Sequence, residues 1–129
     1  MQYRGHQSVL PALARVQCIK PTDKKFKQPR KFDPKAYFSG YYSVFRGKQY
    51  TPEIIQARVV PIAAKFLRSL PLHHSQKEVE PCVFKWFVAP TLDFIQQLRT
   101  YGSELEILQP QSLSEPFKAE LEKQLALYK

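Results

Sequence analysis

Residues 101–110 read YGSELEILQP and place one short strand between two helix boundaries. Gly102 can adopt the positive φ angle that ends a helix after Tyr101. Residues 104–107 alternate polar and apolar side chains, which predicts a half-buried strand. Pro110 then ends the strand and begins a helix predicted to run to Tyr128. This helix–strand–helix unit indicates an α+β domain.

The patterns upstream extend this unit to the order β-α-β-β-α-β with a terminal helix. A strand at 54–60 precedes a helix that Pro61 begins, and a polar strand at 73–80 is expected at a sheet edge. The most apolar strand, at 82–88, places Phe84 and Trp86 on one face, where we expect them in the core. A second helix is predicted to begin at Thr91. This order predicts a ferredoxin-like split βαβ fold over residues 51–129, with one sheet face under helices.

The terminal helix carries apolar residues at spacings of four, four and three, as in a helix that packs along a core. These residues are Phe117, Leu121, Leu125 and Tyr128. Its start stays open between a capping box that begins at Ser112 and a later start before Pro116.

The first fifty residues divide into a strand and a linker. Residues 1–20 contain an alternating segment at 15–20, predicted to be a leftover strand. A single strand cannot bury its own face, so it must pack on the following domain or belong to the sheet of a longer protein. Residues 21–50 form a basic linker, in which Asp33 and Pro34 begin a short helix through about Phe38. Phe26 and Phe32 are expected to anchor this linker.

The formal net charge of +9 is unevenly distributed. Residues 91–129 hold four Lys/Arg and six Asp/Glu, whereas residues 1–90 hold sixteen and five, with the densest cluster at 20–35. A basic front half suits a polyanion such as nucleic acid or a nucleotide. The alternative is a solvated, charged linker.

Eight cations are the candidate contacts to such a polyanion. They are Arg15, Lys20, Lys24, Lys25, Lys27, Arg30, Lys31 and Arg58. A guanidinium group can form two parallel hydrogen bonds to one phosphate, and exposed aromatic rings such as Phe26 or Phe32 can stack on bases. Arg58 is expected on the open face of the sheet. For Arg15, the alternative is an exposed strand arginine without a ligand. For the cations of the linker, the alternative is a flexible linker whose aromatic rings pack on the domain.

Other classes of site have little support in the sequence. Cys18 and Cys82 share no motif and are expected to be reduced and buried. The adjacent His73 and His74 would point to opposite faces of a strand, so we expect no metal site. We find no nucleophile–base set, no phosphate loop and no cofactor motif, which predicts a non-enzymatic protein. No stretch approaches the ~20 apolar residues of a membrane span and no signal peptide is recognisable, so we expect a cytoplasmic protein without membrane contact.

A series of short motifs resembles the C-terminal half of bacterial WYL-domain transcription regulators. The most specific lies at residues 98–110, where a helix leads into Tyr-Gly-Ser, then Glu-Leu-Glu-Ile-Leu, then Pro. Residues 13–16 resemble the strand that closes the WYL barrel, and residues 26–33 resemble the linker after it. Residues 73–77 resemble the middle of the family's C-terminal extension, called WCX. By this resemblance, residues 1–20 end an Sm-like WYL barrel and residues 51–129 form the WCX domain.

The resemblance implies a regulator of three parts. A winged helix-turn-helix binds DNA, the WYL barrel senses a nucleotide or single-stranded nucleic acid, and WCX assists dimerisation or sensing. Arg15 matches a barrel arginine of the basic ligand surface. The sequence has no helix-turn-helix and no Trp-Tyr-Leu signature. We therefore expect an effector-sensing and homodimerisation module whose DNA-binding part is missing. The alternatives are a stand-alone module that binds nucleic acid or nucleotides, and a structural protein-interaction domain.

Overall fold

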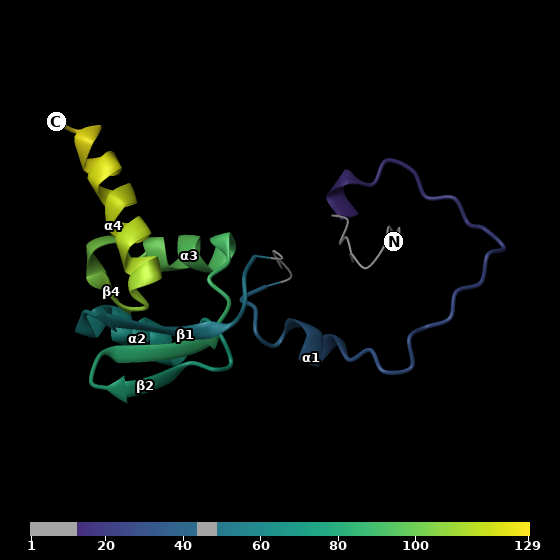
Figure 1. Ribbon diagram of the computed structural model, residues 1–129, viewed down its shortest axis with the longest axis horizontal. Coiled ribbons are helices and arrows are strands. Elements are labelled where there is room, and N and C mark those ends of the chain that lie inside the picture. Colours follow the sequence, from purple (N-terminus) through teal and green to yellow (C-terminus); the bar gives the residue numbers. More distant parts are fainter. Residues whose placement is uncertain (1–12, 44–48) are drawn as a thin grey trace. The chain divides into compact units, whose positions relative to one another are not determined.

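The computed structural model describes residues 13–43 and 49–129 and divides the chain into two units, residues 1–31 and 32–129 (Figure 1). In the first unit, a short 3₁₀ helix (Leu13–Arg15) is followed by irregular backbone. The predicted strand at 15–20 is therefore not formed. Its backbone pairs with no strand among the described residues, and an isolated strand has no ladder of hydrogen bonds to hold it.

The second unit has the predicted order of elements. Its helices and strands are α1 (Pro34–Phe38), β1 (Glu53–Val59), α2 (Pro61–Ser69), β2 (Lys77–Glu80), β3 (Val83–Val88), α3 (Leu92–Arg99), the 3₁₀ turn η2 (Gly102–Glu104), β4 (Leu105–Gln109) and α4 (Gln111–Ala126). None of the helices within the described ranges is long and apolar enough to cross a bilayer.

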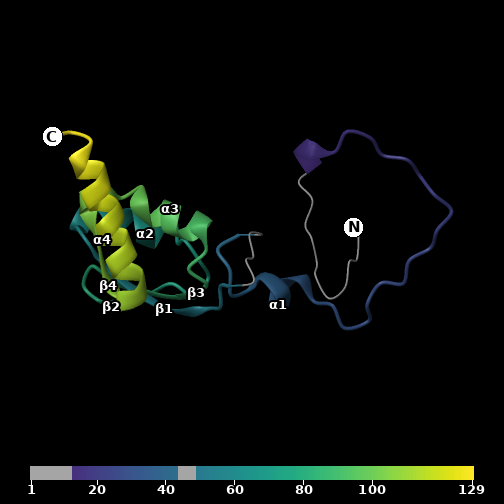
Figure 2. The same cartoon turned by 45° about the horizontal axis from the view of Figure 1, so that its top comes forward.

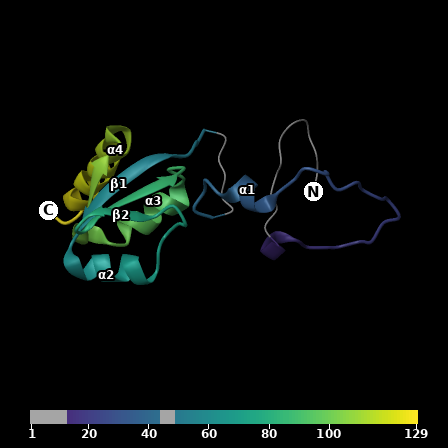
Figure 3. The same ribbon diagram turned by 90° about the horizontal axis from the view of Figure 1, so that it is seen from below.

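The four strands form one antiparallel sheet in the order β2-β3-β1-β4. Ala57 at the centre of β1 pairs with Phe84 of β3 and with Ile107 of β4. The strands β1 and β2 are thus separated by β3, and β3 and β4 by β1, which is the ferredoxin-like split βαβ arrangement. Helices α2 and α3 lie on one face of this sheet (Figures 2 and 3).

The core lies between that face and the helices. Ile55 and Ala57 of β1 and Phe84 and Trp86 of β3 point into it, and all four are fully buried. The helices contribute Ala63, Ala64 and Leu67 from α2 and Phe94, Ile95 and Leu98 from α3. Trp86 packs edge-on against Phe94, with ring centroids 5.9 Å apart. The alternation of buried and exposed residues along β1 and β3 confirms the predicted core assignment of Phe84 and Trp86.

Several boundaries differ from their predictions. The strand β2 is shorter, because residues 73–76 form a turn, and it lies at the predicted sheet edge. The helix α3 ends at Arg99, and Gly102, at φ 56°, begins η2. The last helix begins at Gln111, directly after Pro110 as that proline predicts and before the two starts left open at Ser112 and before Pro116, because the Pro110 carbonyl accepts hydrogen bonds from Leu113 N and Ser114 N. It ends at Ala126, two residues before the predicted end at Tyr128. Pro116 lies inside that helix.

The apolar stripe of α4 is buried only in its first half. Leu113 and Phe117 belong to the core, but Leu121 is 49% exposed and Tyr128 is 83% exposed. The helix continues beyond the sheet, so its last two turns have no neighbouring element to cover them (Figure 1). The expectation that the whole stripe packs on the core was therefore wrong.

The segment before β1 is fastened to the domain from residue 32 onward. Asp33 caps α1 as predicted, accepting a hydrogen bond of 3.0 Å from Lys35 N. Phe32 packs on Tyr37, whereas Phe26, in the first unit, is 86% exposed and is no anchor within that unit. The Ala89 backbone N–H donates to the Gly40 carbonyl at 2.7 Å. The compact unit thus begins before the predicted domain start at residue 51.

Candidate functional site

The predicted polyanion contacts are distributed over both units. Seven of the eight lie in the first unit, and all seven are exposed: Arg15, Lys20, Lys24, Lys25, Lys27, Arg30 and Lys31. Within the part of the chain that the structure describes, none of these seven forms a salt bridge. Their charges are therefore available to an external anion, although irregular backbone sets no fixed geometry among them.

Arg58 lies on the open face of β1, in the second unit. Its guanidinium Nη1 is 3.2 Å from the Glu106 carboxylate, which faces it across the β1–β4 pair. This cross-strand ion pair partly neutralises the one candidate cation that lies outside the first unit. Beside it on the same open face, Ile54 and Phe87 form an exposed apolar pair.

A polar network that sequence reasoning missed surrounds Gln76 in the turn before β2. Its Oε1 accepts hydrogen bonds of 3.0 Å from Trp86 Nε1 and from Leu72 N, and its Nε2 donates to the Leu67 carbonyl at 2.7 Å. This amide therefore joins the end of α2, the turn and the core strand β3. The sequence predicted an edge strand over this stretch and gave no signal for the role of Gln76, whose contacts stabilise the fold.

Two adjacent histidines, His73 and His74, occupy the same turn with their rings tilted against each other. The rings of His73 and His74 lie 4.1 Å apart, and His74 Nε2 is 2.6 Å from the Ser39 carbonyl oxygen. His73 is buried, its Nδ1 accepts from Ser75, and its Nε2 has no hydrogen-bond partner within the described ranges. Burial, and then the neighbouring charge of His74, lower the pKa of His73, while the Ser39 and Tyr41 carbonyls partly offset this. The prediction that the pair lies on a strand was wrong.

A bidentate ion pair links α2 to the edge strand. Arg68 donates from Nε and Nη2 to the two Glu78 carboxylate oxygens at 2.7 and 2.6 Å, and Glu78 Oε1 also accepts from Cys82 N. These hydrogen bonds lower the pKa of Glu78 to about 2. The hydrogen bond from Cys82 N lies in the turn between β2 and β3, where Cys82 has φ 63°. The Arg68–Glu78 ion pair therefore stabilises the fold.

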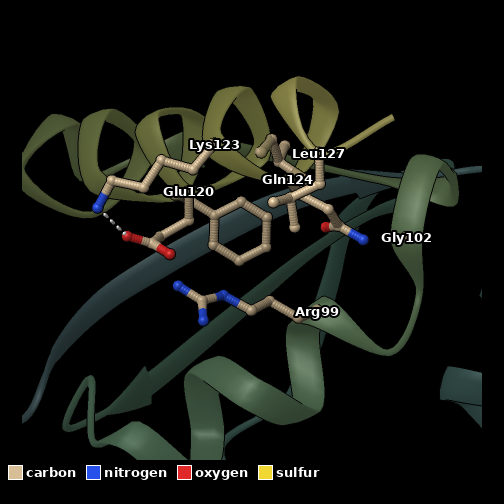
Figure 4. A pocket seen from close by; sticks show the side chains of 8 residues that line it. Arg99, Gly102, Glu120, Lys123, Gln124 and Leu127 are labelled. Atoms are coloured by element: carbon tan, nitrogen blue, oxygen red, sulfur yellow. Dashed lines mark hydrogen bonds and ion pairs between the residues drawn. The ribbon is translucent and has the colours of Figure 1, made fainter. Parts of the chain in front are cut away.

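A cleft lies between the end of α3 and the exposed half of α4. Its volume is about 400 Å³, within the range of small-molecule sites. Arg99 extends from α3 toward α4, whose Glu120, Gln124 and Leu127 line the opposite wall (Figure 4). The Arg99 guanidinium carbon lies 5.6 Å from the centroid of the Phe117 ring, a cation–π arrangement. Sequence periodicity could not reveal this cleft, because its two walls belong to separate elements.

The charges in the cleft are unequal. Glu120 and Lys123 form an ion pair of 2.8 Å, whereas Arg99 makes no hydrogen bond or salt bridge within residues 13–43 and 49–129. The pKa of Glu120 is lowered, first by the hydrogen bond from Lys123, then by its charge, and more weakly by Arg99. The cleft therefore carries one positive charge in excess.

No metal or disulfide site forms among the residues that the structure describes. No three His, Cys, Asp or Glu side chains come together there in a way that could hold a metal ion. Cys18 and Cys82 are both free thiols, and Cys18 is exposed, so the prediction that it is buried was wrong.

No protein-family model matches this chain, and no curated protein matches it. The resemblance to WYL-domain regulators therefore stays a prediction.

Proposed function

We propose that this chain is the effector-sensing and dimerisation module of a bacterial transcription regulator, and that it acts in the cytoplasm without covalent chemistry. The ferredoxin-like fold and the motif at 98–110 support this proposal. In such a module an effector shifts the parent protein between two arrangements of its domains. The size of that shift is set by the difference between the effector's affinities for the two arrangements.

One observation carries the proposal, namely the uncovered apolar face of α4. Leu121 and Leu125 lie on a helix whose first half already packs on the core, and Tyr128 continues their exposed stripe in the turn after the helix. Residues 111–129 contain three lysines and three glutamates, so the whole net charge of +9 lies elsewhere. Two copies of a basic protein repel each other least where they are neutral. We therefore assign this face to a second copy.

Sedimentation of the purified chain tests the dimer. We expect a concentration-dependent dimer that Leu125→Glu converts to a monomer. Leu92→Glu is the matched control, because Leu92 at the start of α3 is 53% exposed and Leu125 is 55% exposed. A monomer at the highest attainable concentration, or equal loss of dimer in both variants, would contradict the proposal.

The gene context tests whether this chain belongs to a transcription regulator. The reading frame upstream of Met1 is expected to encode a helix-turn-helix and a Trp-Tyr-Leu motif. A stop codon and a separate promoter immediately upstream would argue strongly against this part of the proposal.

A second candidate function is nucleic-acid binding by residues 20–35. It is supported by the exposed ring of Phe26, which follows Lys24 and Lys25 and precedes Lys27, where an anchoring role had been expected. Exposed aromatic rings between cations can stack on unpaired bases while the cations hold phosphates.

Fluorescence anisotropy with a single-stranded oligonucleotide tests this second function. The triple substitution Lys24→Ala, Lys25→Ala and Lys27→Ala should flatten the slope of log K against log salt by about 2. Alanine at Lys118, Lys123 and Lys129 is the control and should leave the slope unchanged. Absence of binding at low salt would exclude this function for the chain.

A further inference from the structure

We propose that the cleft between α3 and α4 binds a small amphipathic carboxylic acid, with its carboxylate on Arg99 and its apolar body along α4. This inference rests on the proposed function in one respect, because it names the chemical class of the effector. The binding site itself stands on the geometry of the cleft.

Arg99 supplies the anion-binding group. Its guanidinium carbon lies 5.6 Å from the centroid of the Phe117 ring, and its N–H groups have no hydrogen-bond partner among the described residues. A guanidinium fork matches a carboxylate with two parallel charge-assisted hydrogen bonds. The neighbouring acid, Glu120, is already paired with Lys123 at 2.8 Å, so it competes weakly for Arg99.

The rest of the cleft selects an apolar body. Leu121 and Leu127 line it together with Phe117, and Gln124 adds one amide (Figure 4). A ligand that covers these exposed leucines removes apolar surface from water, which favours binding. A highly charged anion such as a nucleotide would place several charges beside one unpaired cation and the Glu120 carboxylate. The charge balance therefore favours a monoanion with an apolar body.

The position of the cleft links ligand binding to self-association. Leu121 lines the cleft and also belongs to the stripe that we assign to a second copy. A bound acid that contacts Leu121 would change the surface presented to that copy. The site is thus placed where occupancy can shift a monomer–dimer equilibrium.

Fluorine NMR on the full chain tests the site with para-(trifluoromethyl)benzoate as the probe. We expect saturable line broadening with the benzoate and none with para-(trifluoromethyl)benzamide, which has the same ring without the charge. Arg99→Gln should weaken benzoate binding about tenfold, since a hydrogen bond between charged groups is lost. Arg99→Lys should restore part of it.

Lys118→Gln is the matched control, because Lys118 is an exposed cation of α4 that does not line the cleft. It should leave benzoate binding unchanged. Equal binding of benzoate and benzamide, or equal affinity in wild type and Arg99→Gln, would overturn the proposed site. A thermal unfolding curve of Arg99→Gln shows whether this variant is folded, so that a loss of binding can be attributed to the site.

Sedimentation with and without the benzoate separates the two proposals. If the benzoate binds through Arg99 but the chain stays monomeric throughout, the site is supported and the dimerisation role fails. If the chain dimerises through Leu125 and no benzoate binds, the dimerisation role stands and the site proposal is wrong.

Discussion

The indole Nε1 of Trp86 donates a hydrogen bond of 3.0 Å to the side-chain Oε1 of Gln76. Trp86 is fully buried, so its N–H group has no water to bind. A buried donor without a partner costs about 1–3 kcal/mol. This one contact therefore ties the only tryptophan of the core to the turn that leads into β2.

Gln76→Leu should lower the free energy of unfolding by about 2–3 kcal/mol. It removes the acceptor for Trp86 Nε1 and Leu72 N and the donor to the Leu67 carbonyl. Urea denaturation followed by Trp86 fluorescence measures this. The control is Gln96→Leu on the exposed side of α3, which should change the free energy by less than about 0.5 kcal/mol. Equal effects of the two substitutions would show that the network contributes nothing.

Glu78→Gln should destabilise the protein at neutral pH by an amount that disappears in acid. The pKa of Glu78 is lowered to about 2 by the hydrogen bonds from Arg68 and then from Cys82 N, against an ordinary value of 4.5. Its contribution is therefore present above pH 4.5 and is lost as the pH falls from 4.5 toward 2. Thermal unfolding of both proteins across this range measures the difference.

Glu80→Gln is the control for that prediction. Glu80 lies on the same strand, and no salt bridge to it occurs within the described ranges. We expect its substitution to leave the pH dependence unchanged. A Glu78→Gln difference that persists at the lowest pH would refute the role of the ion pair.

The His73 ring should titrate below its ordinary value of 6.5. Burial and then the charge of His74 lower its pKa, so the folded protein favours the neutral form. The stability that this provides is present above pH 6.5 and declines as the pH falls from 6.5 toward the lowered pKa. NMR titration of the ring protons measures the midpoint. A midpoint at or above 6.5 would contradict the burial of this ring. The variant His73→Asn should flatten the stability curve just below pH 6.5.

Gly102→Ala should lower the free energy of unfolding by about 1–2 kcal/mol, because Gly102 has φ 56° and a side chain there is strained. An added Cβ would meet no atom within 4 Å, so the whole effect comes from the backbone. Gly102→Asn should be milder, since asparagine tolerates this conformation better. Thermal unfolding of the two variants tests this order.

Gly40→Ala provides the contrast, because its added Cβ would lie 2.4 Å from Pro52 Cγ. That effect comes from a clash, so asparagine should be no milder than alanine at this position. If asparagine destabilised the protein less than alanine at Gly40 but not at Gly102, backbone strain at Gly102 and a clash at Gly40 would both be wrong explanations.

Local pattern predicted much of the second unit. Alternation identified β1 and β3 and the faces that bury Ala57 and Trp86, and the proline positions located the starts of α1 and α2. These features depend on neighbours within a few residues. Pro110 located the start of α4 in the same way, whereas the capping box at Ser112 and the position of Pro116 suggested later starts that the structure does not show.

The candidate cleft could not be predicted in the same way. Arg99 ends one helix and Phe117 lies inside another, and their 5.6 Å approach depends on how β4 returns the chain to the sheet. The Gln76 network likewise joins residues of α2, a turn and β3. Non-local contacts of this kind leave no periodic signal in a single sequence.

The order of elements, the α+β class, the inward faces of the strands and the concentration of positive charge before residue 91 all follow from the amino-acid sequence. They do so because side-chain period, proline geometry and charge are properties of short segments. The folded arrangement adds two features: the apolar stripe of α4 leaves the core after Phe117, and Arg99 faces it across a cleft. The sequence does not show them because burial depends on which elements are present to cover a face. The sheet ends before the helix does.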